Sequence, residues 1–405
     1  MGGRSNAGAR TWHSLAALAA LAGTAVSWWQ LNRAAALVPR LDATAPLPPR
    51  CGPLRVAVVI PARDEADHLA PCLASLVAQK LAPTAIWVVD DHSTDATPLM
   101  LHRLARELPT LHVLAAPERP PGWVGKTWAL HVGVTAALAD GTADWLLLTD
   151  ADTGHHPELL WRALALVDEM GVDLLTAMPA VSDEGQGATL VRAAIGEGLS
   201  FLYGADYPAR TRDPQRSEAM AAGQFILLRA GAAQGGLDRV GVRDALDDDR
   251  ALVMDVKAAG HRVAFAYAQA LLTTVGYPTA KAAWQGHAHH LTASLGERTG
   301  LWRALGAVLA TGATLSLPFI ALAVAIWQVR RQGWRAALPA LLHWGSHAAA
   351  VSLLRARAAR MANLPGWYVL AAPPAALVVQ GLLVRLIVRH RLGRNAIVWK
   401  GRRYD

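Results

Sequence analysis

Between residues 55 and 152 the chain alternates short apolar runs, rich in β-branched residues, with stretches in which apolar residues recur at helical spacing. The apolar runs are 55–61, 85–91, 111–117 and 144–152, and the helical stretches are 64–79, 95–109 and 125–138. Strands and helices in this rhythm predict an α/β fold with a mainly parallel sheet and right-handed crossovers. Ligands of such sheets bind outside the carboxyl ends of the strands, so a functional site is expected there.

The composition indicates that lipid forms part of the chain's environment. Of the 405 residues 53% are hydrophobic and 17% are charged, whereas about a quarter of the residues of a soluble chain are charged. The length would suit two ordinary domains, or one domain with membrane anchors. Long apolar runs favour anchors, and the predicted N-terminal and C-terminal transmembrane helices are 14–31, 304–327 and 366–388.

Two apolar runs have a second interpretation. Run 14–31 also fits a cleaved signal peptide, because basic residues precede it, but the Pro-rich linker 43–54 favours a retained anchor. Run 336–354 is interrupted by His343 and His347, so we expect it to lie at the membrane surface rather than to cross it. By composition the chain divides into an anchor at 1–42, a linker at 43–54, an α/β domain at 55–300, membrane segments at 301–390 and a basic tail at 391–405.

The net charge of +8 and the pI of about 9.9 suit a partner that carries phosphates, or an anionic membrane surface. We do not expect nucleic acid as a partner, because the basic residues flank apolar segments and form no patch interleaved with aromatic residues. Cys51 and Cys72 provide neither a disulfide framework nor metal-ligand spacing. A reducing, cytosolic location of the α/β domain is therefore expected.

Acidic side chains follow three of the predicted strands. They are Asp90 and Asp91 after the second run and Asp150 and Asp152 after the fourth, with Asp64 after the first. A single carboxylate can cap the following helix, which is the role expected of Asp64 and Asp95. Several carboxylates at one sheet edge repel one another unless a divalent cation or a donor-rich ligand compensates them. Mg²⁺ and Mn²⁺ prefer oxygen ligands and often share them with substrate phosphates.

Four segments in this order, "VVIPARDEADHLAPCLASLVAQ", "IWVVDDHSTDAT", "GWVGKTWAL" and "LLLTDADT", resemble the N-terminal half of a family 2 glycosyltransferase with a GT-A fold. The resemblance implies that the first two strands bind the base and ribose of a nucleotide-sugar, and that the Asp-x-Asp holds Mg²⁺ or Mn²⁺ against the diphosphate. The implied nucleotide-sugar-binding residues are Pro61, Ala62, Arg63, Glu65, Asp90, Asp91, Lys126 and Asp150, and the implied metal ligands are Asp152 and Asp150.

Two downstream segments extend the resemblance. "AMAAGQFILLR" is similar to the family's strand on the acceptor side, with Gly223 and Gln224 at its centre. "LDDDRALVMDVKAAGHRVAF" resembles the family's acidic pair, which is followed by a Leu and a Gly; in this register Asp248 and Asp249 are the catalytic pair and Asp249 is the base. Taken alone, these acids also fit a solvated helix start, where negative charge is favourable.

The chain departs from the family's processive members, which carry a Gln-x-x-Arg-Trp box. The corresponding region, 281–295, has no Arg-Trp, which favours transfer of a single sugar; its His287, His289 and His290 are candidates for contact with the diphosphate or the acceptor. The order of segments is most similar to the bacterial hopanoid-associated glycosyltransferases, including a tail like "VWKGRRY". A lipid acceptor is expected from the apolar segments alone, because they would place the opening of the catalytic domain at the bilayer surface. The expected location is a multi-pass protein of the inner membrane with a cytosolic catalytic domain.

Other functions fit the sequence less well. "PPGWVGKT" ends like a phosphate-binding loop, but Pro120 stands where that loop needs its first Gly. A nucleotidyltransferase would also use an Asp-x-Asp and a divalent metal, yet the first strand is not followed by a Gly-rich signature loop. A non-catalytic membrane scaffold of this fold is a further alternative, against which Asp91, Asp152 and Asp249 argue.

Overall fold

The structure is a computed structural model, which describes residues 4–44, 46–48, 54–234, 237–238, 241–245, 247–294, 298–391, 397–399 and 402–404. Within these ranges, side chains are described except at 4–20, 288–294, 298–301, 303, 386 and from 389 onward. Cys51 lies outside the described residues, whereas Cys72 is a buried free thiol.

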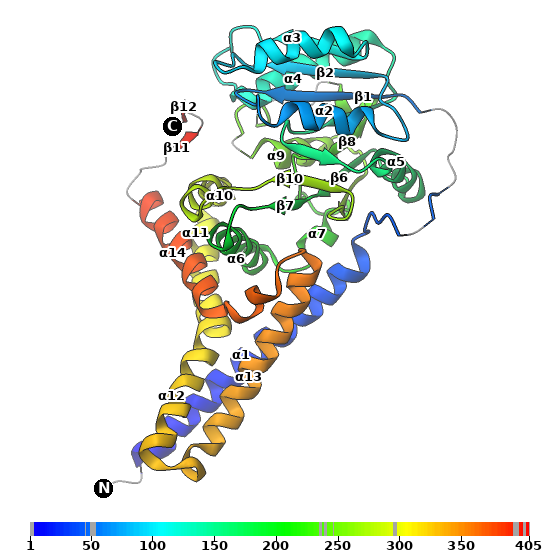
Figure 1. Cartoon of the computed structure of the whole chain (residues 1–405). Coiled ribbons are helices and arrows are strands. Elements are labelled where there is room, and N and C mark those ends of the chain that lie inside the picture. The colour runs from blue at the N-terminus through cyan, green and yellow to red at the C-terminus, as the bar shows by residue number, and fades with distance from the viewer. Residues whose placement is uncertain are drawn as a thin grey trace. The chain divides into compact units, whose positions relative to one another are not determined.

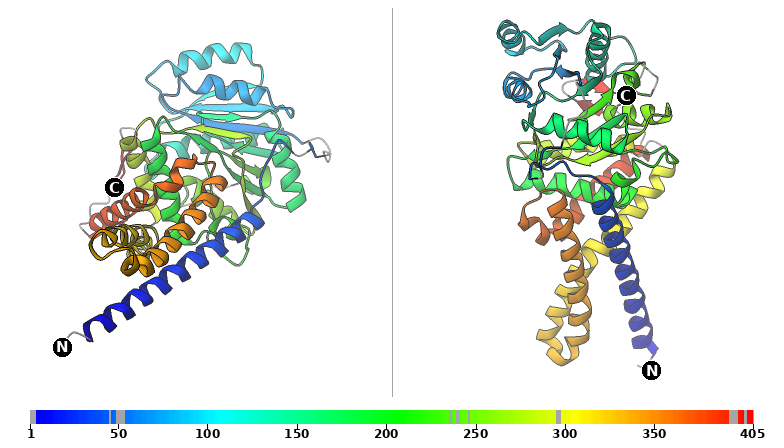
Figure 2. Two further views of the ribbon diagram at one scale, coloured as in Figure 1. Left: turned by 60° about the horizontal axis from the view of Figure 1, so that its bottom comes forward. Right: turned by 90° about the vertical axis from the view of Figure 1, so that its right-hand side faces the viewer.

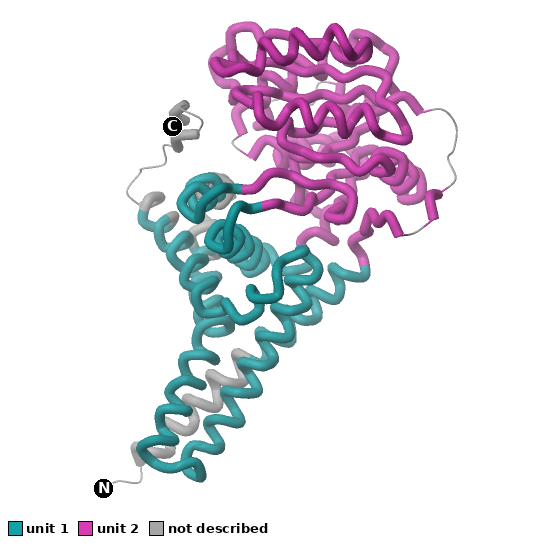
Figure 3. Tube along the Cα trace, in the orientation of Figure 1, with its two compact units in different colours: residues 1–36, 183–206, 277–405 teal, residues 37–182, 207–276 magenta. Residues whose placement is uncertain are grey.

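The chain divides into two compact units (Figure 3). The sheet unit comprises residues 37–182 and 207–276, and the helical unit comprises residues 1–36, 183–206 and 277–405. The predicted α/β domain at 55–300 is therefore divided between them. Residues 183–206 and those from 277 onward belong to the helical unit because their apolar faces pack with C-terminal helices.

The sheet unit is built on a seven-stranded sheet in the order β3-β2-β1-β4-β8-β6-β9 (Figure 1). The strands are β1 Val56–Ala62, β2 Ala85–Asp90, β3 Leu111–Ala115, β4 Trp145–Leu148, β6 Leu174–Met178, β8 Ile226–Arg229 and β9 Val263–Tyr267. Strand β8 is antiparallel to β4 and β6, and the other neighbouring pairs are parallel. The predicted α/β fold with a mainly parallel sheet is confirmed.

Helices cover both faces of this sheet. They are α2 Leu69–Val77, α3 Thr97–Glu107, α4 Gly125–Asp140, α5 Leu159–Met170 and α9 Asp248–Ala258, with the short helices α7 Tyr207–Arg210 and α8 Ala230–Ala233. Successive residues of a strand point to opposite faces. Val58 and Ile60 accordingly pack with α2, α3 and α5, whereas Ala57 and Val59 pack with α4 and α9.

Helix α4 approaches the sheet closely at Gly133. A Cβ at this position would lie 2.5 Å from a Val59 methyl carbon and 2.9 Å from a Val89 methyl carbon. Any larger side chain would push α4 away from β1 and β2. Since Lys126 lies in the first turn of α4, this contact helps to fix where its ammonium group stands.

A smaller sheet in the order β5-β10-β7 completes the sheet unit. Its strands are β5 Thr153–His155, β7 Ala180–Ser182 and β10 Leu272–Val275. The prediction of one strand over 144–152 is wrong at its C-terminal end, because β4 stops at Leu148. Asp150 and Asp152 lie in the turn between β4 and β5, and Asp152 is tied to β10 by the Val275 N–H, which donates to the Asp152 backbone carbonyl over 3.2 Å.

The helical unit contains most of the C-terminal part of the chain. Its elements are α1 Arg4–Leu37, α6 Gln186–Tyr203, α10 Ala280–Ser294, α11 Arg298–Thr311, the π-helical turn η1 Gly312–Ser316, α12 Leu317–Gln332, α13 Trp334–Met361, the 3₁₀ turn η2 Gly366–Leu370, α14 Ala372–Arg391, and the tail strands β11 Ile397–Trp399 and β12 Arg402–Tyr404. Helices α12 and α13 run side by side as a hairpin (Figures 1 and 2). A buried ion pair between Glu197 and Arg355 links α6 to α13.

Among the described residues, one helical stretch, Ala304–Gln332, is long and apolar enough to cross a membrane, with a mean hydropathy of 2.0 over an 18-residue window. It includes the predicted span 304–327. The multi-pass prediction is not supported by the part of the chain that the structure describes. Span 14–31 lies within α1, but its side chains up to residue 20 are outside the described residues.

The prediction of one continuous span over 366–388 is wrong. A 3₁₀ turn covers Gly366–Leu370, and α14 begins only at Ala372. Pro373 and Pro374 follow immediately. Proline has no N–H to give to a preceding turn and fits the first turn of a helix, so the helix starts afresh here.

Candidate functional site

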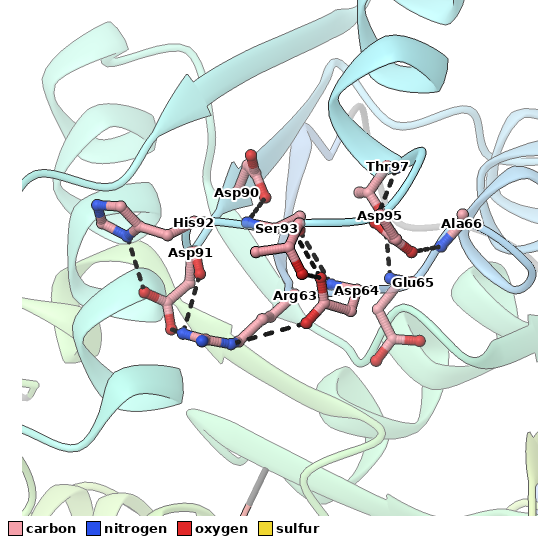
Figure 4. A network of polar contacts seen from close by, with 11 residues as sticks. Arg63, Asp64, Glu65, Ala66, Asp90, Asp91, His92, Ser93, Asp95 and Thr97 are labelled. Carbon is pink, nitrogen blue, oxygen red and sulfur yellow. Dashed lines mark hydrogen bonds and ion pairs between the residues drawn. The ribbon is translucent and has the colours of Figure 1, made fainter. Parts of the chain in front are cut away.

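Two loops meet at the carboxyl ends of β1 and β2 (Figure 4). Asp64 Oδ1 accepts hydrogen bonds from the Thr94 N–H over 2.7 Å and from the Thr94 hydroxyl over 3.2 Å. In return the Asp64 N–H donates to Ser93 Oγ over 2.9 Å. From the second loop, Asp95 Oδ2 accepts from the Ala66 N–H over 3.1 Å. The two loops therefore hold each other through carboxylates and backbone donors.

These contacts correct the capping role expected of Asp64 but not that of Asp95, whose Oδ1 accepts from the N–H of Thr97, the first residue of α3, over 2.9 Å. The residues before α2 and α3 are His68 and Ala96, and neither forms a side-chain cap in the described structure. Asp64 adopts a left-handed backbone with a φ of 54°, and its carboxylate accepts hydrogen bonds from the neighbouring loop. Helix α2 therefore begins later than predicted, at Leu69. Hydrogen bonds from Thr94 lower the pKa of Asp64, and hydrogen bonds from Thr97 lower the pKa of Asp95.

The predicted base and ribose contacts lie beside these loops. Asp91 is buried, and its Oδ2 lies 3.6 Å from Arg63 Nη1. The same guanidinium nitrogen donates to the Asp91 carbonyl over 3.3 Å, while Asp91 Oδ1 lies 3.3 Å from His92 Nδ1. Asp90 Oδ1 accepts from the Ser93 N–H over 3.1 Å and so stabilises the turn. The Arg63 guanidinium therefore supplies positive charge beside buried Asp91.

The remaining predicted residues of this region are placed by β1. Pro61 and Ala62 are its last two residues and pair with Val89 and Asp90 of β2. Glu65 follows in the loop, where its Oε2 lies 3.1 Å from His68 Nδ1. Its charge is close enough to Asp152 to raise the pKa of that carboxyl. The structure thus brings the first loop next to the Asp-x-Asp turn.

The two aspartates of that turn have different surroundings. Asp150 Oδ1 forms an ion pair with Lys126 Nζ over 2.7 Å. Asp152 Oδ1 accepts from the Thr274 hydroxyl over 3.3 Å. Burial, together with the charges of Asp150 and Glu65, raises the pKa of Asp152 to about 6. The turn therefore holds more negative charge than its neighbours compensate.

Lys126 lies among several carboxylates. Burial by itself would lower the pKa of this ammonium group, but the charges of Asp150, Asp248 and Asp249 outweigh it and raise the pKa above its ordinary value. Lys126 is therefore held in its charged form and is unsuited to act as a base. Its single positive charge offsets only part of the surrounding negative charge.

The donor set of the turn fits a divalent cation that is shared with a substrate. Across the described residues there is no group of three or more His, Cys, Asp or Glu side chains arranged as a metal site. Asp150 and Asp152 would offer carboxylate oxygens from one side, leaving other positions to water and phosphate. Mg²⁺ is commonly bound in this way, through one or two carboxylates together with substrate phosphates.

The predicted base lies in the first turn of α9. Asp249 Oδ2 accepts from the Gly223 N–H over 2.7 Å, and its Oδ1 accepts from the Arg250 N–H over 2.7 Å. A Cβ on Gly223 would stand 3.3 Å from the Asp249 Cβ and 3.4 Å from Lys126 Nζ, so the three residues are in close contact. Burial raises the pKa of neighbouring Asp248, and the positive charge of Lys126 opposes this rise.

Gly223 and Gln224 do not lie at the centre of a strand, so the prediction for 219–229 is wrong in this respect. Strand β8 starts at Ile226, and the preceding residues form a turn. The backbone N–H of Gly223 is bonded to Asp249 instead of to a neighbouring strand. Gln224 contributes its carbonyl, which accepts from the Thr149 hydroxyl over 2.7 Å.

One group of functional candidates was missed at the sequence level. Thr149, Thr153, His155 and Ser75 form hydrogen bonds with one another below the Asp-x-Asp turn. A signal is present in "TDADTGH", where Thr153 and His155 alternate as the inward positions of a strand. Their partners Ser75 and Gln224 are distant in sequence, so the pattern alone could not assign them a role.

Several predicted residues are outside this cluster. The His287 ring contacts Tyr277 edge to face, with 5.1 Å between ring centroids, in the helical unit. The side chains of His289 and His290 lie outside the described residues. In the tail, Trp399 falls in β11 and Tyr404 in β12, again with undescribed side chains.

Known proteins resemble the chain in sequence and in fold. The β-monoglucosyldiacylglycerol synthase of Synechocystis sp. is 28% identical over 169 residues, which are 40% of this chain and 32% of that protein. The chain thus matches about a third of the length of this curated relative. Among solved structures, mannosyltransferase PcManGT from Pyrobaculum calidifontis, in complex with GDP-Man and Mn²⁺, has a TM-score of 0.49 and 17% identity, covering 94% of this chain and 98% of that one. Residues 1–349 of TarS from S. aureus give a TM-score of 0.39 and 16% identity, covering 86% and 96%.

The family assignment rests on the longest match. Residues 53–299 match the family model described as "Glycosyltransferase like family 2", which covers more than half of the chain. The matched range contains β1, the Asp-x-Asp turn and α9, and therefore every residue of the cluster around Lys126. The chain belongs to the glycosyltransferase-like family 2.

Proposed function

We propose that the protein transfers a single sugar, with inversion, from a nucleotide-sugar to a lipid, and that the transfer requires Mg²⁺ or Mn²⁺. The observation that carries this proposal is the cluster around Lys126. It brings the Asp-x-Asp turn and the acid at the start of α9 to the same ammonium group. Glycosyl transfer needs a cation for the departing diphosphate and a base for the attacking hydroxyl. A turn that could bind a metal and a carboxylate that could act as base, both beside one ammonium group, suit these two roles.

The nucleotide-sugar would bind across the ends of β1 and β2. Arg63 and Asp91 form an ion pair there, and the Glu65 N–H donates to the Thr97 hydroxyl at the start of α3 over 2.9 Å. Asp90 and Asp91 would contact the ribose and the base, and Pro61 and Ala62 at the end of β1 would line the bottom of the nucleotide site. A ligand entering this place meets side chains that are already oriented, which reduces the entropy lost on binding.

A bound Mg²⁺ or Mn²⁺ would be held by Asp152 and Asp150 and would supply positive charge to the departing diphosphate. Lys126 would add a second positive charge beside the same phosphates, since its amine is held in the charged form. The family resemblance and the uncompensated charge of the turn support this assignment of roles.

Asp249 is proposed as the base. Two backbone N–H groups fix both of its oxygens, so the carboxylate has one orientation toward an incoming hydroxyl. The acceptor oxygen attacks the anomeric carbon while the bond from that carbon to the diphosphate oxygen breaks. The diphosphate leaves with the bonding electron pair, and the hydroxyl proton passes to Asp249. Attack opposite to the leaving group inverts the anomeric centre.

A lipid acceptor is supported by three features of the chain. The curated relative is named as a synthase of a glycolipid, the helix Ala304–Gln332 is apolar enough to cross a membrane, and the net charge of +8 suits an anionic membrane surface. Within this class we propose a hopanoid, on the similarity of the segment order and of the tail "VWKGRRY". The catalytic domain would then face the cytosol at the inner membrane.

The test is transfer of label into lipid by purified membranes given a panel of radiolabelled nucleotide-sugars. We expect one donor to label lipid in the presence of Mn²⁺ and chelation to stop it. The matched control for Asp249→Asn is Asp168→Asn, an exposed aspartate on α5. No labelling from any donor, or equal labelling by Asp249→Asn, would contradict the proposal and favour a non-catalytic scaffold.

A further inference from the structure

A network of buried polar side chains lies directly beneath the Asp-x-Asp turn. We define the buried polar network as Ser75, Thr149, Thr153 and His155. Thr149 is 1% exposed, Thr153 is 3% exposed and His155 is 5% exposed, whereas Ser75 is half-buried. Buried polar groups are costly unless each donor and acceptor is paired, so the hydrogen atoms of this network can be counted.

The network joins two parts of the site that are far apart in sequence. Thr153 Oγ1 donates to the carbonyl oxygen of Asp150 over 2.7 Å, within the turn itself. Thr149 Oγ1 lies 3.0 Å from Thr153 Oγ1 and donates to the carbonyl oxygen of Gln224 over 2.7 Å. Gln224 adjoins Gly223, whose N–H holds Asp249. Because Thr149 directly precedes Asp150, its hydrogen bond to Gln224 connects the Asp-x-Asp turn to the loop that holds the base.

The His155 ring contacts the hydroxyls of Thr149 and Ser75. Its Nε2 lies 3.1 Å from Thr149 Oγ1, and its Nδ1 lies 3.1 Å from Ser75 Oγ. Burial lowers the pKa of His155 to about 4, so the ring is neutral and carries one proton. A neutral imidazole donates from one nitrogen and accepts at the other, and the two choices have different consequences.

If Nδ1 carries the proton, Nε2 must accept from Thr149, and the Gln224 carbonyl loses the Thr149 proton. If Nε2 carries the proton, it donates to Thr149 Oγ1, and Thr149 remains free to donate to Gln224. The Ser75 hydroxyl then donates to Nδ1. This withdraws its 2.7 Å hydrogen bond from the Cys72 carbonyl, but that carbonyl lies inside α2 and has its helical partner four residues on. Both arrangements form the same number of hydrogen bonds, but only the second keeps a donor on the Gln224 carbonyl, while the Cys72 carbonyl retains its helical partner.

We propose that His155, as the Nε2–H tautomer, is the positioning residue that fixes the Asp-x-Asp turn relative to Asp249. It acts through Thr149, which ties the turn to the loop carrying Gly223. The predicted effect on rate rests on the proposed glycosyl transfer, whereas the tautomer rests on the burial and the hydrogen bonds of the His155 ring.

Two substitutions separate the nitrogens of the ring. His155→Gln places an amide N–H near the position of Nε2, whereas His155→Asn places one near the position of Nδ1. We expect His155→Asn to lower kcat about 100-fold, the effect of a misplacement of about 1 Å, with KM for the nucleotide-sugar unchanged. His155→Gln should recover most of this loss. The neighbouring exposed His156 provides the control, since His156→Asn should leave kcat unchanged.

The tautomer itself is measured by ¹⁵N NMR of the full chain with labelled histidine, with the signal assigned by its loss in His155→Gln. We expect protonated Nε2 and unprotonated Nδ1 at pH 7. A protonated Nδ1, or a kcat of His155→Asn equal to or above that of His155→Gln, would overturn the proposal. If the wild type transfers no sugar, the proposed function fails, and the NMR result still decides the tautomer.

Discussion

Two pairs of aspartates lie at the same edge of the sheet and differ in what surrounds them. Asp64 and Asp95 sit in the loops after β1 and β2, and backbone N–H groups approach their oxygens. Asp150 and Asp152 sit in the turn after β4, where one oxygen meets Lys126 and another meets a threonine hydroxyl. Hydrogen bonding lowers the pKa of the first pair, whereas burial raises the pKa of Asp152.

Under the proposed function, the acids of one sheet edge divide between structural and metal-binding roles. A carboxylate that already accepts several backbone donors has little to gain from a cation. A carboxylate that is buried with few donors is unstable in its charged form until a cation arrives. The protein retains the second kind in the turn after β4, where the proposed function puts the diphosphate and the metal.

The largest effect is expected from Asp249→Asn. Asp249 combines features of both pairs, because backbone N–H groups orient it and yet it lies beside Lys126. Asparagine keeps the size and one acceptor but cannot take a proton. We expect kcat to fall about 10²–10⁴-fold. The melting temperature should fall only modestly, because one of the two backbone N–H groups loses its acceptor. If the loss of kcat were fully explained by the fraction of protein unfolded at the assay temperature, the carboxylate would be structural, as Asp64 is.

Lys126→Met tests whether the ammonium group compensates the acids around it. Without this charge, Asp150 and Asp248 lose their nearest cation, and we expect the free energy of unfolding to fall by about 1–2 kcal/mol, below the value for a fully buried pair because part of the side chain is exposed. Added Mn²⁺ should restore part of the loss. Differential scanning calorimetry with and without Mn²⁺ measures both changes. Lys126→Arg, which keeps the charge, is the control, and a loss of the same size there would contradict the account.

Much of the fold was readable from the sequence, because its signals are local. The alternation of apolar runs predicted β1, β2, β3 and β4 with α2, α3 and α4 between them. The acids at the strand ends could be recognised for the same reason, since they follow directly in sequence. The fold, the family and the general place of the site all come from patterns of this kind.

Other features depend on contacts between distant residues. His155 bonds to Ser75 across 80 residues, and Thr149 bonds to Gln224 across 75 residues. Asp64 could not be distinguished from a helix cap, because its partner Thr94 lies in another loop. Hydropathy alone also misjudged 366–388, where two prolines restart the helix.

The pH dependence of metal binding sharpens the comparison. Because the pKa of Asp152 is raised to about 6, its carboxyl becomes protonated below about pH 6, and the proton competes with the cation. We expect the Mn²⁺ affinity to be constant above pH 7 and to fall about tenfold per unit below pH 6. Isothermal titration calorimetry over pH 5–8 measures this. A fall that begins only near pH 4 would indicate an ordinary exposed carboxylate.

The smallest effect is expected from Asp64→Asn. The substitution weakens the hydrogen bonds to Thr94 but leaves the loop in place, and the side chain is partly exposed. We expect the melting temperature to fall by about 1–3 °C, with the Mn²⁺ affinity unchanged. A loss of metal binding in this variant would mean that both acid pairs serve the same ion.

The most direct measurement of the central claim is an electron paramagnetic resonance titration of Mn²⁺ with UDP or GDP present, on wild type, Asp152→Asn and Asp64→Asn. We predict that wild type and Asp64→Asn bind one Mn²⁺ together with the diphosphate, and that Asp152→Asn loses this binding while remaining folded. Retention of Mn²⁺ by Asp152→Asn, or its loss from Asp64→Asn, would contradict the assignment of the metal to the turn after β4.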